Sequence, residues 1–407
     1  MAILPGHVVH SHYATVDVPA TFLVTLLFVI LLRLLGSADL GWYLVAGLVL
    51  GLAAATKYTA GLAVVALLAA HFFAHDEDGN APPLTHLVAA IIVAGIAFFA
   101  VTPYLVVMTN HGFRINPDAA RDIRFEMEHM RVGGTFAFVN TGSGWVYHLL
   151  RSLPAAMGYV ALAFGLIGTG LLIQRGGALA LVLLSFALPY FGLVGAGKER
   201  FLRYMMPLLP VLVVSAVYAL ERLREASAPR LGKWGAMIAP AALGGACFVL
   251  TIWYTGQMVG IMMAPDVRDR AADWLRANVN RSTKIGLASV PWYFTPPITP
   301  FNGGLRSLAE FHNWQQEKPP YHVIVVGWDT AALRRARPDY FVVSDAEYAD
   351  LLRLHRPDAV GLMQALPERY RTLRVFEAPA PLPALRPDKL ACPPDWLYTW
   401  PRIEVHH

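Results

Sequence analysis

Residues 18–35 read VPATFLVTLLFVILLRLL, an apolar run whose single charge is Arg33. A run of about 18 largely apolar residues is long enough for a helix to cross a bilayer, so this stretch predicts a membrane span. Similar runs recur through the first 254 residues and predict about eight spans. They cover residues 18–35, two short spans within 42–73 that meet at a tight turn near 56–58, and 86–108, 154–173, 178–196, 205–220 and 235–254.

The composition of the whole chain agrees with a membrane protein. Of its 407 residues 56% are hydrophobic and 15% are charged, whereas soluble domains carry about 25% charged residues. These values exclude a purely soluble enzyme and a disordered chain. The net charge of +5 is attributed to loop bias and contact with membrane lipid, and nucleic acid is not expected as a partner. Cys247 and Cys392 lie in an apolar run and a polar tail, so we expect neither a disulfide nor a thiolate metal cluster.

Basic residues in the short loops predict the orientation of the spans. The loop 221–234 should be cytoplasmic, since it is rich in arginine and lysine. Alternation then places the N-terminus, the loop 109–152, the segment 197–204 and everything after residue 256 outside. Positive charge retained in the outer segments indicates an anionic partner at the membrane surface, with ordinary solvated loops as the alternative. The basic residues of the cytoplasmic loop are Arg222, Arg224, Arg230 and Lys233.

After about residue 256 charged residues return, and strand and helix patterns alternate. The fold class is therefore mainly α: a polytopic helical membrane bundle over residues 1–256, followed by a small α/β domain over residues 257–407. This domain contains no GxGxxG, Walker A or HExxH motif, so we expect structural support or a lid over the membrane site. Its predicted elements are a helix at 269–277, strands at 284–289, 322–327 and 339–344, a helix from an N-cap at Asp345 to Leu354, and a last strand at 371–376.

The segment HSHYATVDVP (residues 10–19) places a carboxylate, Asp17, at the outer end of the first span. An ionisable group at that position is a candidate functional residue. His10 and His12 with Asp17 could also hold a divalent cation. The alternative for Asp17 is an N-cap for a helix that has Pro19 in its first turn, and both roles are compatible.

Lys57 is the single charge in some thirty apolar residues. A lysine in hydrocarbon must either extend to the membrane surface or meet an anion. Basic side chains recur in KERFLRYMMP (residues 198–207), where Lys198, Arg200 and Arg203 form the strongest predicted anion site in the chain.

The outer loop at residues 116–140 contributes carboxylates that could bind a sugar or act as a general base. The alternative is the polar face of a helix that lies on the membrane. These carboxylates are Asp118, Asp122, Glu126 and Glu128.

The segments HSHYATVDVPATF, LVLGLAAATKYTAG and ERFLRYMMPLLPVL occur in that order. Together they resemble the polytopic GT-C glycosyltransferases, above all the family 39 type of bacteria and archaea, which is related to protein O-mannosyltransferases and to the aminoarabinose transferase of lipid A. The tail PPDWLYTWPRIEV resembles the end of members with an outer C-terminal domain. The similarity covers most of residues 7–260.

The resemblance implies transfer of a hexose or pentose from a polyprenyl-phosphate donor to a lipid, glycan or protein acceptor at the outer face of the plasma membrane. It assigns the carrier phosphate to a group of basic residues and Asp17 to the catalytic site. The residues at those positions are Lys57, Lys198, Arg200 and Arg203, with Tyr204 beside them.

Family members have more chain before the HSHYATVDVP segment, including an outer loop with an acidic residue taken as the base. We therefore expect an N-terminally incomplete member whose main catalytic carboxylate is missing. Two other classes are weighed against an enzyme. A lipid or solute transporter is disfavoured because no internal repeat is present and the charges gather at one membrane face. A non-catalytic accessory protein stays open.

Overall fold

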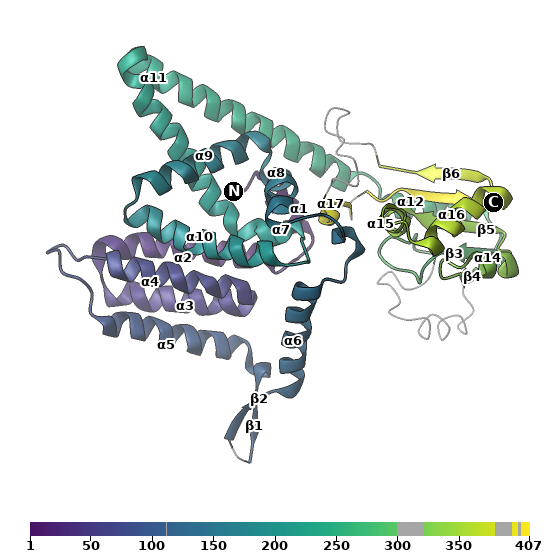
Figure 1. Cartoon of the computed structure of the whole chain (residues 1–407), viewed down its shortest axis with the longest axis horizontal. Coiled ribbons are helices and arrows are strands. Elements are labelled where there is room, and N and C mark those ends of the chain that lie inside the picture. Colours follow the sequence, from purple (N-terminus) through teal and green to yellow (C-terminus); the bar gives the residue numbers. More distant parts are fainter. Residues whose placement is uncertain (111, 299–320, 379–392, 398–399) are drawn as a thin grey trace. The chain divides into compact units, whose positions relative to one another are not determined.

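The computed structural model describes the whole chain except residues 111, 299–320, 379–392 and 398–399 (Figure 1). The chain divides into two compact units, Met1–Thr255 and Gly256–His407. The first unit is helical, and the second contains a five-stranded mixed sheet. The expected fold class, a helical membrane bundle followed by a small α/β domain, is confirmed.

Long apolar helices dominate the first unit. Within the described residues, five helical stretches are long and apolar enough to cross a membrane: Asp17–Ser37, Leu84–Val101, Ala178–Ala196, Leu202–Arg230 and Trp234–Asn278, the last of which continues past residue 255, where the second unit begins. A bent pair, Gly144–Met157 with Tyr159–Arg175, makes a sixth if it counts as one span. The helices at Leu40–Thr56 and Tyr58–Phe73 are apolar but shorter, and they account for the difference from the eight predicted spans.

The first unit begins with six helical elements and continues through a hairpin to a chain of shorter helices. The first six are α1 (Pro5–His12), α2 (Asp17–Ser37), α3 (Leu40–Thr56), the 3₁₀ helix η1 (Tyr58–Ala63), α4 (Val64–Phe73) and α5 (Leu84–Val101). The middle elements are η2 (Pro103–Leu105), β1 (Val106–Thr109), β2 (Gly112–Ile115), α6 (Pro117–Val132) and η3 (Phe136–Phe138). The last are α7 (Gly144–Tyr147), the π-helical turn η4 (His148–Ser152), α8 (Leu153–Met157), α9 (Tyr159–Arg175), α10 (Ala178–Ala196), η5 (Leu202–Leu208) and α11 (Leu209–Met263), which is broken at Gly232.

Small residues let helices α3 and α5 approach closely. A Cβ atom on Gly47 would collide with the carbonyl oxygen of Ala90, and one on Gly51 with that of Ala94. Glycines four residues apart form the close-packing surface typical of membrane helix pairs. This packing fixes the end of α3, where Lys57 follows as its C-cap residue.

Two predicted spans are interrupted. The span expected at 86–108 ends as a helix at Val101, because Thr102 precedes Pro103 and the residue before a proline avoids helical geometry. The chain then forms the β1–β2 hairpin. The span expected at 154–173 bends by 119° between α8 and α9. Gly158, with a φ of 82°, forms that break.

The second unit is a sheet with helices on both faces. Its strand order is β4-β3-β5-β7-β6, in which β4, β3 and β5 are parallel and β7 runs antiparallel to β5 and β6. The strands are β3 (Lys284–Leu287), β4 (His322–Val325), β5 (Tyr340–Ser344), β6 (Thr372–Phe376) and β7 (Ile403–His406). The helices are α12 (Val267–Asn278), α14 (Thr330–Ala336), α15 (Asp345–Arg353), α16 (Pro357–Arg369) and α17 (Pro394–Leu397).

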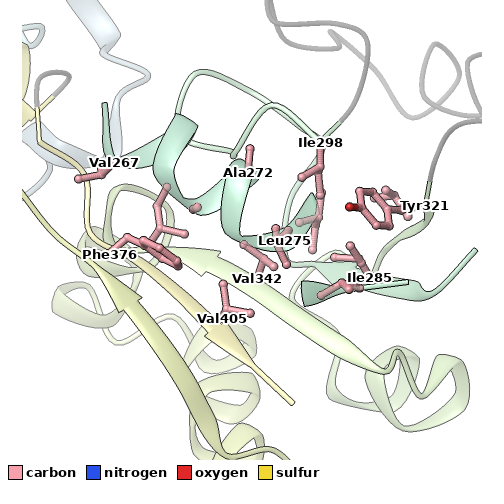
Figure 2. Packing of buried hydrophobic residues seen from close by; sticks show 14 residues of the cluster. Val267, Ala272, Leu275, Ile285, Ile298, Tyr321, Val342, Phe376 and Val405 are labelled. Atoms are coloured by element: carbon pink, nitrogen blue, oxygen red, sulfur yellow. The ribbon is translucent and has the colours of Figure 1, made fainter. Parts of the chain in front are cut away.

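Alternation along the strands separates two apolar cores. Val342 packs on the side of α12 with Leu275 and Val405 (Figure 2). The neighbouring Phe341 packs on the other side, against residues of α14 and α16. This pattern follows from the period of two in a strand, which sends successive side chains to opposite faces.

Two predictions for this unit are wrong in detail. The strand at 371–376 is not the last, because β7 follows it and lies between β5 and β6. The N-cap of α15 is Ser344 rather than Asp345. Its hydroxyl accepts from the amide of Ala346, and Glu347 completes a capping box by accepting from the amide of Ser344.

Glu347 should make this unit less stable at alkaline pH. Burial raises the pKa of the Glu347 carboxyl to about 7, although hydrogen bonds from Ser344 and Ser289 act in the opposite direction. A carboxyl whose pKa is higher in the folded state contributes stability below its ordinary pKa near 4.5, and this contribution is lost as pH rises through 7. We expect a loss of at most about 3 kcal/mol. Amide exchange of β5 and α15, corrected for intrinsic rates at pH 5 and pH 8, measures it.

The variant Glu347→Gln should flatten this pH dependence, since glutamine does not ionise. Glu368→Gln, at an exposed position of α16, is the matched control and should leave the dependence unchanged. An equal slope in wild type and Glu347→Gln would contradict the assignment.

Candidate anion site at the end of helix α2

Asp17 is the first residue of helix α2, and its side chain is buried. The N-cap is Val16, and no side chain caps this helix, so the predicted capping role of Asp17 is wrong. Instead, one carboxylate oxygen accepts a hydrogen bond from the ammonium group of Lys57. The other oxygen lies 3.8 Å from Nε of Arg203. Asp17 therefore holds two cations.

Lys57 reaches this carboxylate from the junction between α3 and η1. Its backbone is extended, with a φ of −153°, which turns the chain between the two helices. The side chain is only 16% exposed, and its Nζ lies 4.5 Å from the ring centroid of Tyr204. A lysine in an apolar region must either extend to the membrane surface or meet an anion, and Lys57 meets an anion.

Arg203 comes from η5, far along the chain. Its guanidinium carbon lies 4.0 Å from the ring centroid of Phe201 and 5.4 Å from that of Tyr204. Together, Lys57 and Arg203 carry two positive charges against the single negative charge of Asp17. Two cations thus converge on one carboxylate, and basic side chains gathered in this way are the groups that bind phosphate oxygens.

The charges of Asp17, Lys57 and Arg203 act on His10, whereas His12 lies on the exposed surface. Burial is the main cause that lowers the pKa of His10 to about 4; Arg203 and Lys57 also lower it, and Asp17 opposes them. His10 is therefore neutral at pH 7. His12 is exposed, and its Nδ1 lies 2.8 Å from the carbonyl oxygen of Val8.

The predicted cation site on this pair does not fit the geometry. Positions i and i+2 of a helix point about 200° apart, so two such side chains do not converge on one ion. Over the described ranges, no group of three or more histidine, cysteine, aspartate or glutamate side chains is placed to hold a metal.

Arg200 and Lys198 were predicted to join the phosphate site, but their contacts are with other groups. The Arg200 side chain is only 5% exposed; its Nη1 donates to Oγ1 of Thr141 at 2.5 Å, and its Cζ lies 5.8 Å from the ring centroid of Tyr147. Lys198 is exposed at the end of α6, where its amide donates to the carbonyl of Met130. The structure thus brings together Asp17, Lys57, Arg203 and Tyr204.

A series of aromatic contacts connects the two arginines. The ring of Tyr147 contacts Phe138 at 5.9 Å, Phe138 contacts Phe201 at 4.9 Å, and Phe201 contacts Tyr204 at 5.6 Å between centroids. Arg200 lies against the first ring of this series and Arg203 against the last two. The series forms an apolar wall with a cation at each end.

Glu199 is a buried carboxylate whose role does not follow from the sequence. One oxygen accepts from the amides of Gly134 and Thr135 at 2.6 and 3.0 Å, and the other accepts from the Thr135 hydroxyl at 2.6 Å. Nε2 of His129 lies 3.6 Å away. Glu199 therefore anchors the chain that follows α6. The only signal in the sequence was an acidic residue between two basic ones, with its partners some 65 residues earlier.

Removal of this anchor should loosen the segment after α6. In Glu199→Ala the amides of Gly134 and Thr135 lose their acceptor, and each lost bond to a charged group costs about 1.5–3 kcal/mol. We expect their hydrogen exchange to become about 10–100 times faster. The control is Glu128→Ala on the exposed face of α6. Unchanged exchange at Gly134 would mean that the anchor lies elsewhere.

The acidic residues of α6 match the predicted polar helix face. Asp118 pairs with Arg121, and Glu128 with Arg131, each at 3.0 Å on the exposed surface. Asp122 and Glu126 are exposed as well. Nothing in these contacts selects one of the four as a base.

The family comparison bears on the part of the chain that supplies most of this site. Residues 1–106 match the family model described as dolichyl-phosphate-mannose-protein mannosyltransferase. The matched range contains His10, Asp17 and Lys57. No match was found among curated proteins.

Proposed function

We propose that this chain, whose residues 1–106 match the family model described as dolichyl-phosphate-mannose-protein mannosyltransferase, is a membrane glycosyltransferase that transfers a sugar from a polyprenyl-phosphate donor to a lipid, glycan or protein acceptor. The observation that supports this most strongly is the convergence of two cations, Lys57 and Arg203, on the buried carboxylate of Asp17. These residues approach from three separate parts of the chain. A cluster of this kind suits a phosphate that gains negative charge as its bond to the sugar breaks.

Each residue has a distinct part in this reaction. The guanidinium of Arg203 and the ammonium of Lys57 bind phosphate oxygens and stabilise the leaving group. Asp17 is a positioning residue that fixes both cations. Tyr204 packs against the two cations through its ring and borders the phosphate.

The charge pattern supports a location at the outer face of the plasma membrane. The exposed arginines Arg222, Arg224 and Arg230 precede the break of α11 at Gly232, and short basic loops lie in the cytoplasm. Arg203, at the opposite end of that span, is then on the outer side. Alternation places the start of α2 and the end of α3 on the same side, in agreement with the contacts of Asp17 and Lys57. The C-terminal domain would then be extracytoplasmic.

Turnover in a reconstituted system tests this function. The chain is placed in lipid nanodiscs with radiolabelled polyprenyl-phosphate hexoses and pentoses and a lipid, glycan or peptide acceptor. Release of free polyprenyl phosphate together with a labelled product supports the proposal. Binding of the carrier without turnover of any donor would contradict it and favour a non-catalytic accessory protein.

A further inference from the structure

The β1–β2 hairpin has one wholly apolar face. In its register Val106 pairs with Ile115, and Met108 pairs with Phe113. Because side chains alternate along a strand, these four residues share one face. The opposite face carries Val107, Thr109 and Arg114.

The apolar face is uncovered in the described part of the chain. Met108 is 81% exposed, Phe113 76% and Ile115 70%. An isolated two-stranded hairpin is at best marginally stable in water, and this one would in addition leave three large apolar side chains in solvent. The hairpin therefore needs an apolar environment over this face, both to stabilise the pair of strands and to shield the three side chains from water.

The position of the hairpin indicates which environment covers its apolar face. Strand β1 starts five residues after Val101, the last residue of the membrane-spanning helix α5. The exposed side chains of α5 are mostly apolar, and Tyr104, between α5 and the hairpin, is exposed as well. The exposed residues of α5 include Ile92, Ile96, Phe99 and Val101.

We propose that the β1–β2 hairpin inserts its apolar face into the boundary layer of the bilayer, as a lipid-bound extension of α5. Met108, Phe113 and Ile115 enter the acyl region. Arg114, on the opposite face, lies at the level of the lipid phosphates, where basic side chains are favoured. The hairpin thereby anchors the chain before α6 in the membrane. The chain after α6 is held by Glu199.

Site-directed spin labelling of the full chain tests the proposal. Cys247 and Cys392, the two cysteines of the sequence, are replaced by serine, and a label is attached in Phe113→Cys or, as the matched control, Arg114→Cys. The protein is placed in vesicles of phosphatidylglycerol and phosphatidylethanolamine. Collisions with oxygen, which concentrates in the acyl region, are compared with collisions with a water-soluble nickel complex.

The label at position 113 should collide several-fold more often with oxygen than with nickel, and the label at 114 should show the reverse. Equal access of nickel to both labels would overturn the proposal, because the apolar face would then lie in water. Low access of both reagents to position 113 would also overturn it, since another protein surface would then cover the face. If Phe113→Cys does not fold, Met108→Cys with Thr109→Cys tests the same two faces.

Discussion

Replacement of Arg203 by glutamine should lower kcat/KM for a polyprenyl-phosphate sugar by about 10²–10³-fold, as expected for a lost charged donor at a leaving group. Glutamine keeps part of the side-chain length and a polar end, but removes the charge. The ammonium of Lys57 remains, bonded to Asp17, so the variant has one cation fewer with which to bind the phosphate. The measurement is single-turnover kinetics in nanodiscs.

Lys198→Gln is the matched control for this prediction. Lys198 is a cation of the same ten-residue segment, but it is exposed and its backbone lies against the end of α6. Its removal should change kcat/KM by less than about threefold, as for a screened surface charge. A comparable loss in both variants would show that general surface charge, and not the Asp17 cluster, determines donor use.

Replacement of Lys57 by methionine should cost about 3–5 kcal/mol of the free energy of unfolding, because it removes the bonded partner of a buried carboxylate. Arg203, at 3.8 Å, compensates only in part. The measurement is equilibrium unfolding by sodium dodecyl sulfate in mixed micelles.

The double variant Asp17→Asn with Lys57→Met isolates the interaction. It should be more stable than Lys57→Met alone, because the buried charge is gone, and the coupling energy from the cycle reports the pair. Additive losses would contradict the ion pair. Activity should stay low in the double variant, which separates the structural effect from binding of phosphate.

The sequence was sufficient to predict the membrane face on which a residue lies, because this depends only on counting the spans. Asp17 begins one span, Lys57 follows the next, and Arg203 begins a later one, so alternation alone predicts that they share a membrane face. It did not predict that Arg200 would diverge from Arg203. Arg200 lies outside any helix or strand and Phe201 is extended before η5 begins at Leu202, so the direction of the Arg200 side chain depends on tertiary contacts with Thr141 and Tyr147.

The other differences also have local causes. The apolar residues that follow Pro103 were included in the span predicted at 86–108, although the helix ends before Pro103 and Met108 lies in a hairpin. Strand β7 was missed because four residues give too little pattern; it is defined by pairing with β5 and β6. Glu199 was missed because its hydrogen-bond donors, Gly134 and Thr135, are distant in sequence.

Native mass spectrometry of the purified chain with undecaprenyl phosphate tests the central claim most directly, because it counts bound carrier without requiring turnover. Wild type and Lys198→Gln should each retain one carrier molecule, whereas Arg203→Gln and Lys57→Met should lose it at the same carrier concentration. Equal retention by all four proteins would contradict the account, since the phosphate would then be held by groups other than the cations around Asp17.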